Sequence, residues 1–260
     1  MNQLIKFEFR KLFKSTAFIV CAILTLVALI ISALMLYMTY QALYEIEEAG
    51  VSFREYLEIL GVNSFELTYE FANSSMLYLL SGIFVSIFVC KDYSSFTIKN
   101  VYSKGYTRRQ VYFSKYIVSL AGVMIITSLA YIVSILAGLL LFGKLGPFPK
   151  YYLLILLLQL IVITVYHAFH FFISNSLGKS GGAVSLCIVL PTGVNLLTSL
   201  FDLTMKNKVL ISDYWISNLS SLVVKDNIGL DKLGFVALVS ICHIAIWLGL
   251  GYLVNRKKQF

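Results

Sequence analysis

Apolar residues dominate six long runs of the chain, and charged or turn-forming residues separate each run from the next. Each run can cross a membrane as a helix, because a hydrocarbon core about 30 Å thick needs roughly 20 apolar residues. Continuous runs favour helices over the alternating strands of a membrane barrel. The pattern predicts an all-α polytopic membrane protein with one transmembrane domain and spans at about 16–40, 73–90, 116–142, 151–173, 183–201 and 233–254.

Composition and charge agree with a membrane protein and indicate its orientation. Hydrophobic residues make up 59% of the 260 residues, charged residues make up 13%, and the mean hydropathy is +0.84. Placing both termini in the cytoplasm puts 14 of the 21 Lys and Arg residues inside and seven outside. This excess of basic residues on the inside is the expected asymmetry, because basic residues beside spans stay in the cytoplasm. The net charge of +8 is thus explained by topology, and no nucleic acid is expected as a partner.

Three segments outside the spans carry informative patterns. Residues 1–15 predict an amphipathic helix on the cytoplasmic membrane surface, with basic side chains toward the headgroups. Residues 41–72 predict an acidic external loop, which either gathers cationic substrates or is simply a solvated face. Residues 202–232 are external and contain Tyr214 and Trp215, so part of this segment can return to the membrane interface. The apolar side of the first segment consists of Leu4, Ile5, Phe9, Leu12 and Phe13.

The longest polar and basic stretch between two spans is the cytosolic loop 91–115, whose six basic residues face a single acid, Asp92. A short helix is expected inside it, with Ser94 or Ser95 capping its start and Gly105 ending it. The loop either only sets the topology or passes force from a soluble partner into the membrane. The expected apolar face of the short helix consists of Phe96, Ile98, Val101 and Tyr102.

The order of residues in this loop resembles the first cytosolic loop of ABC-2 type transporter permeases. The matching positions are Asp92, Thr97-Ile98-Lys99-Asn100, Gly105, Arg108 or Arg109, and Lys115. Two positions depart from the family pattern, which more often has Glu at Asp92 and commonly has Gly at Phe96. Together with six spans, the resemblance implies the ABC-2 permease fold, an elbow helix over 1–15, and a re-entrant or interfacial helix pair within 202–232.

The resemblance also implies partners. In this family the short helix is a coupling helix that docks on a separate ATPase subunit, which binds the ATP. A second permease chain, identical or a similar sister, would complete the pore. Small bacterial permeases of this kind often export antimicrobial peptides such as lantibiotics or bacitracin, or confer immunity to them, from the bacterial plasma membrane. The residues assigned to docking in this way are Ser94, Phe96, Ile98, Lys99, Val101, Tyr102 and Arg108.

The sequence carries no pattern that predicts catalysis. Gly178-Lys179-Ser180 is not a phosphate-binding loop, because position 173 is Ile where such a loop needs its leading Gly. The chain is therefore expected to be no enzyme and to hold no cofactor of its own. The predicted spans contain no deep Asp, Glu, Lys or Arg, which argues against an ion-coupled carrier. An ATP-independent channel, carrier or peptide-sequestering immunity protein is the alternative that the residues leave open.

Polar residues inside two spans are candidates for a translocation path. His167 and His170 lie one helical turn apart, so both could face one partner. A metal site would want a third ligand and nearby carboxylates, which the spans do not offer, so no metal is expected. Pro191 predicts a kink or break in the fifth span, and Thr192 and Asn195 follow it. These five residues are predicted to pack helices together or to line the path.

Overall fold

The computed structural model describes residues 1–46, 65, 74–142, 151–205, 210–224 and 230–258. Most of the predicted acidic loop 41–72 lies outside this part of the chain. Six described helices are long and apolar enough to cross a membrane, as the hydrophobic pattern predicts. They are α2 (Thr16–Ile46), α5 (Ser75–Ser94), α7 (Arg108–Phe142), α8 (Tyr152–Leu177), α9 (Ser180–Met205) and α11 (Leu230–Lys257).

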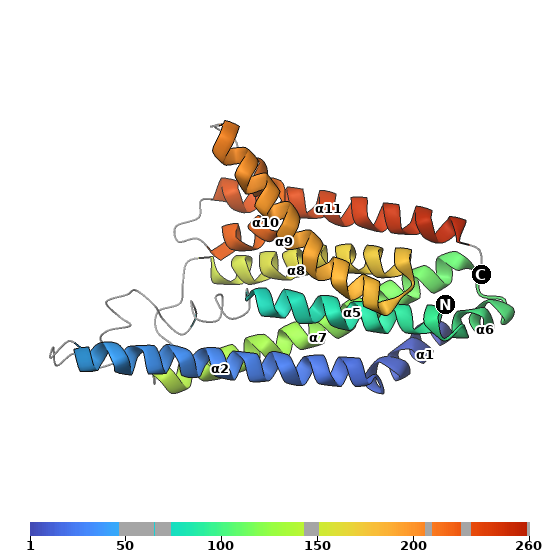
Figure 1. Ribbon diagram of the computed structural model, residues 1–260. Helices are drawn as coiled ribbons and strands as arrows, with labels where there is room; N and C mark the ends of the chain where they lie inside the picture. The colour runs from blue at the N-terminus through green and yellow to red at the C-terminus, as the bar shows by residue number, and fades with distance from the viewer. Residues whose placement is uncertain (47–64, 66–73, 143–150, 206–209, 225–229, 259–260) are drawn as a thin grey trace.

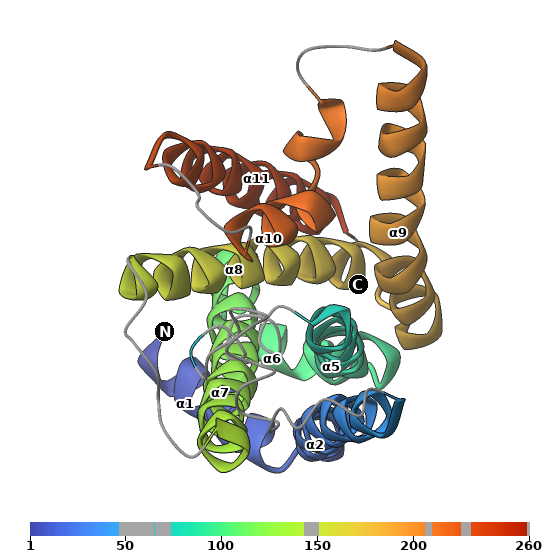
Figure 2. The same ribbon diagram turned by 90° about the vertical axis from the view of Figure 1, so that its left-hand side faces the viewer.

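The long helices other than α9 run roughly along one direction, whereas α9 is inclined to them (Figure 1). The short helix α6 (Thr97–Ser103) lies at the same end of the bundle as α1 (Asn2–Phe13) and the end of α11. We call this the cytoplasmic end, in accordance with the distribution of basic residues. Viewed along the bundle, α8 lies between α11 on one side and α5 and α7 on the other (Figure 2). It contacts all three as well as α9. The helix α8 is therefore the centre of the fold.

Burial differs strongly between the helices. About 67% of the most apolar stretch of α5 is buried, but only 11% of the corresponding stretch of α9. Small residues let α5 approach its neighbours: a Cβ at Gly82 would lie 2.9 Å from the His170 ring. The helix α9 stands at the side of the bundle and contacts α5 and α8 (Figure 2). Pro191 does not break it, since the helix continues from Ser180 to Met205.

The elbow helix α1 packs against α7, but its buried face differs from the predicted apolar side. Leu4, Glu8 and Leu12 are buried at four-residue spacing, whereas Phe13 is exposed. A charged residue thus occupies the middle of the buried face. Leu4 and Leu12 of the predicted apolar side are buried, and Glu8 lies between them because it finds basic partners inside the bundle.

The outer end of the bundle is completed by two short elements. The carboxylate of Asp202, near the end of α9, accepts hydrogen bonds from the backbone N–H groups of Ile211 (2.7 Å) and Ser212 (2.8 Å), which begin the 3₁₀ helix η1 (Ile211–Tyr214). The helix α10 (Ile216–Val224) then packs against α8, α9 and α11. Its inward side chains are fully buried, so this part of the external segment returns to the bundle. They are Ile216, Leu219 and Val223.

A close approach joins α7 to α11. The hydroxyl of Tyr112 donates a hydrogen bond to the carbonyl of Leu248 at 2.9 Å. A Cβ at Gly251 would lie 2.6 Å from that hydroxyl, so a side chain at 251 has no room unless the tyrosine moves. A Cβ at Gly249, two residues earlier, would meet no described atom within 4 Å.

We therefore expect Gly251→Ala to lower the free energy of unfolding by about 1–3 kcal/mol through overpacking. Denaturation in mixed micelles, followed by tryptophan fluorescence, measures this change. Gly249→Ala is the matched control and should unfold near the wild-type midpoint. Adding Tyr112→Phe to Gly251→Ala should recover part of the loss, because it removes the crowded oxygen. Equal midpoints for the two alanine variants would contradict the close packing of α7 on α11.

Candidate functional site

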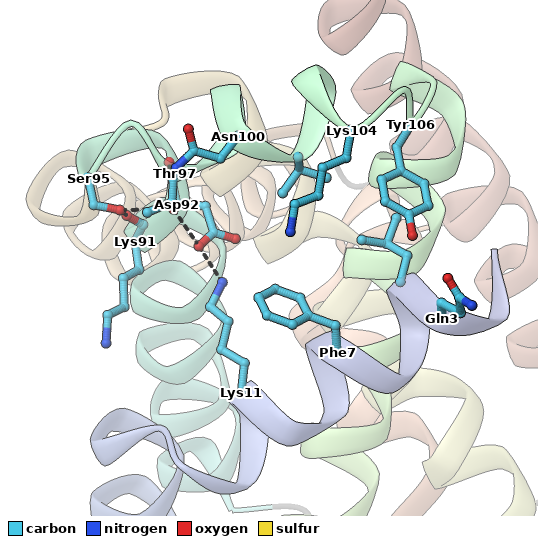
Figure 3. Close-up of a pocket in the computed structure, with 12 residues that line it drawn as sticks. Gln3, Phe7, Lys11, Lys91, Asp92, Ser95, Thr97, Asn100, Lys104 and Tyr106 are labelled. Carbon is cyan, nitrogen blue, oxygen red and sulfur yellow. Dashed lines mark hydrogen bonds and ion pairs between the residues drawn. The ribbon is translucent and has the colours of Figure 1, made fainter.

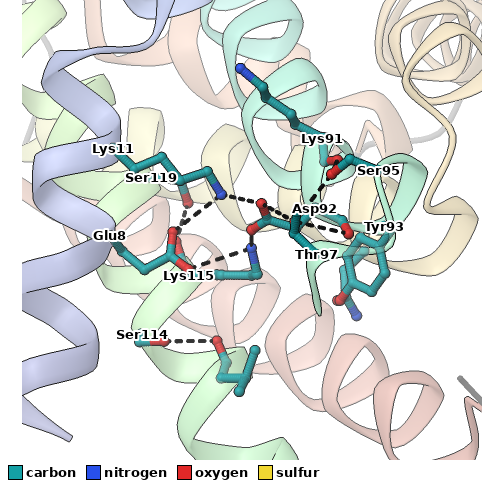
Figure 4. Close-up of polar contacts among 12 residues, drawn as sticks. Glu8, Lys11, Lys91, Asp92, Tyr93, Ser95, Thr97, Ser114, Lys115 and Ser119 are labelled. Carbon is teal, nitrogen blue, oxygen red and sulfur yellow. Dashed lines mark hydrogen bonds and ion pairs between the residues drawn. The ribbon is translucent and has the colours of Figure 1, made fainter. Parts of the chain in front are cut away.

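Four charged side chains of the described residues form a buried cluster at the cytoplasmic end (Figure 4). Asp92, near the end of α5, is paired with both Lys11 of α1 and Lys115 of α7. The carboxylate of Glu8 lies 3.6 Å from the Lys11 ammonium and 3.7 Å from that of Lys115. Two positive and two negative charges therefore alternate across three helices.

The buried charges of this cluster are stabilised because each lies close to an opposite charge. Glu8 and Lys115 are each only 1% exposed, and an unpaired ion at such a depth would be very costly. Burial lowers the pKa of Lys11 below its ordinary value, although the neighbouring Glu8 opposes this shift. The cluster fixes the relative position of α1, α5 and α7, because moving any one of them separates opposite charges.

The short helix α6 is attached to the same cluster. The hydroxyl of Thr97, the first residue of α6, donates a hydrogen bond to the Asp92 carboxylate at 3.2 Å. Ile98 is 2% exposed and packs with Leu4 of α1 and Val111 of α7. A displacement of α6 must therefore act on the elbow helix and on two membrane helices together.

Two predictions about α6 need correction. Ile98 was assigned to docking, but its side chain is buried and packs against α1 and α7. Ser94 and Ser95 do not cap α6, because both hydroxyls donate to the carbonyl of Lys91 in the preceding helix. Phe96 is the residue before α6 instead, with a left-handed backbone (φ 55°) and a side chain that is 67% exposed.

The remaining residues assigned to docking differ in accessibility. Ser94 and Lys99 are exposed, and Val101 and Tyr102 are half-buried. Burial raises the pKa of the Tyr102 hydroxyl. Arg108 donates to the carbonyl of Arg256 at 2.9 Å and also to that of Lys258, so it is tied to the end of α11.

A second set of contacts joins α5, α8 and the end of α11. The hydroxyl of Tyr93 donates to the Asn175 side chain at 2.6 Å, and Asn175 donates to the carbonyl of Gly251 at 3.3 Å. Lys258 donates to the Asn175 carbonyl and lies 4.4 Å from the centre of the Tyr93 ring. Burial lowers the pKa of Lys258. The cytoplasmic ends of the helices thus form one connected unit.

A cavity of about 510 Å³ lies between α1 and α6 (Figure 3). Phe7 and Lys11 line it from α1, and Asn100 and Lys104 line it from the region of α6. Lys91 also contributes, so basic and apolar groups are mixed in its wall. A hollow with this lining, beside the exposed Phe96, is a surface that can receive a side chain of a soluble partner.

A larger cavity of about 820 Å³ lies among α5, α8, α9 and α10. His170, Pro191, Thr192 and Asn195 line it, so the fold brings together four of the five residues predicted for a path. His167 does not line it. Its Nε2 lies 2.9 Å from the Ser119 hydroxyl, on the side of α8 that faces α7.

The two histidines therefore do not share one partner, although they are one helical turn apart. Because α8 is surrounded by neighbours, His167 meets α7 while His170 lies against Gly82 of α5. Among the described residues, no group of three His, Cys, Asp or Glu side chains could hold a metal ion.

Sequence reasoning missed Glu8 and Lys11 as functional candidates. A usable signal was present, because an acid and a base three residues apart on a helix can pair with each other. Their partners Asp92 and Lys115 are far away in sequence, and the pattern of the loop gave no indication that they would pair with residues 8 and 11. The contributions of Tyr78, Tyr166, Ser217 and Ser220 to the larger cavity had no sequence signal that we recognised.

Comparison with known proteins identifies the family. The sequence model described as ABC-2 family transporter protein matches residues 4–194, a range that includes the charge cluster, α6 and the first half of α9. No curated protein and no solved structure matches the chain. Since the match covers well over half of the sequence, the chain belongs to the ABC-2 family of transporter proteins.

Proposed function

We propose that the chain is the membrane subunit of an ABC exporter that is driven by a separate ATPase subunit. As a member of the ABC-2 family it is a membrane transport component and not itself catalytic. The observation that carries the proposal is the buried charge cluster, which ties α6 and the elbow helix to α5 and α7. Force applied to α6 by a soluble subunit would reach the membrane helices through these contacts.

The docking surface in this proposal consists of the exposed residues around α6. Phe96 projects from the start of the helix, Ser94 and Lys99 flank it, and the 510 Å³ cavity lies alongside. An exposed aromatic residue is a common anchor in protein interfaces, because it buries a large area at low entropic cost. The ATPase would bind the ATP, and the permease would need no cofactor.

The transported molecule would pass by the 820 Å³ cavity, in agreement with its place among the membrane helices. A second permease chain, identical or a sister, would complete the path, and the little-buried α9 supports such an additional contact. The substrate in this proposal is amphipathic, with antimicrobial peptides as the first candidates. The location would be the bacterial plasma membrane, with export or self-immunity as the role.

The test is co-purification in mild detergent from the native host, followed by reconstitution. We expect an ABC ATPase to accompany the chain and flux of the substrate to require ATP. A chain that purifies alone and still gives protection or flux without ATP would overturn the proposal. That outcome would instead support an ATP-independent channel, carrier or sequestering immunity protein.

A further inference from the structure

The 820 Å³ cavity has two chemically different walls. The inner wall, from α5, α8 and α10, is rich in groups that form hydrogen bonds. Tyr78 and Tyr166 stack there with ring centres 4.1 Å apart, and Ser217 and Ser220 contribute hydroxyls. The outer wall, from α9, mixes aliphatic side chains with Thr192, Asn195 and Ser199, and Leu196 and the neighbouring leucines on this wall are largely exposed. These neighbours include Leu200 and Leu203.

Two buried polar atoms of the cavity residues have no hydrogen-bond partner within the described part of the chain. They are Nδ1 of His170 and Oδ1 of Asn195, which belong to facing helices. Buried polar atoms in native proteins nearly always have partners, so orphaned atoms beside a hollow point to a ligand that supplies them. His170 itself is 1% exposed, and Gly82 leaves the space in which its ring lies.

Charge is the third feature. Among the described residues that line the cavity, none is Asp, Glu, Lys or Arg. Asp202 near the outer end of α9 does not line it, and the two oxygens of this carboxylate accept hydrogen bonds from the backbone of η1. An ion would lose its hydration here without gaining an opposite charge. A neutral head group would lose much less.

We propose that this cavity binds an uncharged amphiphile, whose neutral hydroxyl or amide head meets Asn195 and whose apolar chain lies along the exposed leucines of α9. A hydroxyl suits the Asn195 oxygen because it can donate one hydrogen bond to it. The size of the cavity is within the range of about 300–1,000 Å³ that is usual for small-molecule sites. The claim that this cavity is the substrate site of an exporter rests on the proposed function. The claim that it binds such an amphiphile does not depend on that function.

The test uses the purified permease in lipid nanodiscs, without any ATPase. Three photoreactive probes share one alkyl chain and differ only in the head group, which is a hydroxyl, a trimethylammonium or a sulfate. Mass spectrometry of labelled peptides reports where each probe reacts. We expect the alcohol to label peptides of α8, α9 and α10 at least about fivefold more than either charged probe does.

Asn195→Leu should lower labelling by the alcohol about fivefold, which corresponds to the loss of one hydrogen bond. Thr198→Val is the matched control on the same helix, since the Thr198 hydroxyl bonds to carbonyls of its own helix at 3.0 Å and does not line the cavity. His170→Leu is a second variant, to be used only if it purifies like the wild type. Equal labelling by the three probes, no labelling by the alcohol, or an unaffected Asn195→Leu variant would overturn the inference. The labelling does not depend on ATPase docking, so a failure of the docking proposal would not change these results.

Discussion

Lys115→Met is expected to lower the free energy of unfolding by about 3–5 kcal/mol, which is the usual cost of breaking a buried ion pair. The substitution keeps an unbranched side chain one atom shorter, but leaves Glu8 and Asp92 with Lys11 as their only cation within the cluster. The cluster then carries one unbalanced negative charge at a site where Glu8 is 1% exposed. Denaturant titration of the detergent-solubilised protein measures the change.

A second substitution distinguishes the effect of the unbalanced charge on the free energy of unfolding from the effect of lost packing. Adding Glu8→Gln to Lys115→Met restores neutrality and leaves the Lys11–Asp92 pair intact. We expect the double variant to recover more than half of the loss, because the unpaired charge and not the missing contact dominates the cost. Lys6→Met, on the exposed side of α1, is the control and should stay within about 0.5 kcal/mol of the wild type. Additive losses in the double variant would contradict this account of the cluster.

Phe96→Asp is expected to reduce recovery of the ATPase subunit with the permease by at least about tenfold, while the permease still inserts and folds. An aspartate on the docking surface replaces an aromatic anchor by a charge that must be desolvated, and hot-spot losses of about 2 kcal/mol or more are common. Because the Phe96 side chain is 67% exposed, the fold itself loses little packing. Co-purification, with size-exclusion chromatography of the permease alone, measures both effects.

The backbone at this position permits a sharper comparison. Phe96 has φ 55°, a conformation that costs a residue with a side chain roughly 1–2 kcal/mol and that glycine adopts freely. Phe96→Gly should therefore keep α6 in place, yet still weaken ATPase recovery because the ring is gone. Leu177→Asp, which places the same charge on an exposed residue at the end of α8, is the control and should leave recovery unchanged. Full recovery with Phe96→Gly would show that Phe96 is not an anchor.

The left-handed backbone also explains a departure from the family pattern. The turn from α5 into α6 has a positive φ at this position, which suits the glycine that the family resemblance implies there. This chain accepts the strain of a phenylalanine there, which is reasonable if the exposed ring contributes to binding. The sequence showed the departure, but only the backbone gives it a physical meaning.

The helices could be predicted from sequence because each depends on local composition. A continuous apolar run is sufficient for a spanning helix, and all six were found on that ground. The faces of the helices could not be predicted in the same way. A membrane-spanning helix carries apolar residues on all its faces, so the hydrophobic pattern does not tell which face of α8 contacts a neighbouring helix. This is why His167 and His170 seemed to share a partner although they do not.

The polar sites depended on contacts between distant residues, and sequence reasoning reached them only in part. Ile98 was assigned to the apolar face of the short helix and to docking, but α1 covers it through Leu4. Glu8 was overlooked because an acid within a basic helix ordinarily faces water. By contrast, Asn195 was identified from a rule that does not require knowledge of the partner, because polar residues in a span face the interior or a cavity.

The charge cluster also constrains how the protein is made. Glu8 and Lys11 leave the ribosome first, and at that stage each can pair only with the other along one helix face. Asp92 arrives with the second spanning helix, and Lys115 arrives only with the third. The Glu8–Lys115 contact and the packing of α1 on α7 can therefore form only after the third helix has been made, so full docking of α1 is a late step of assembly.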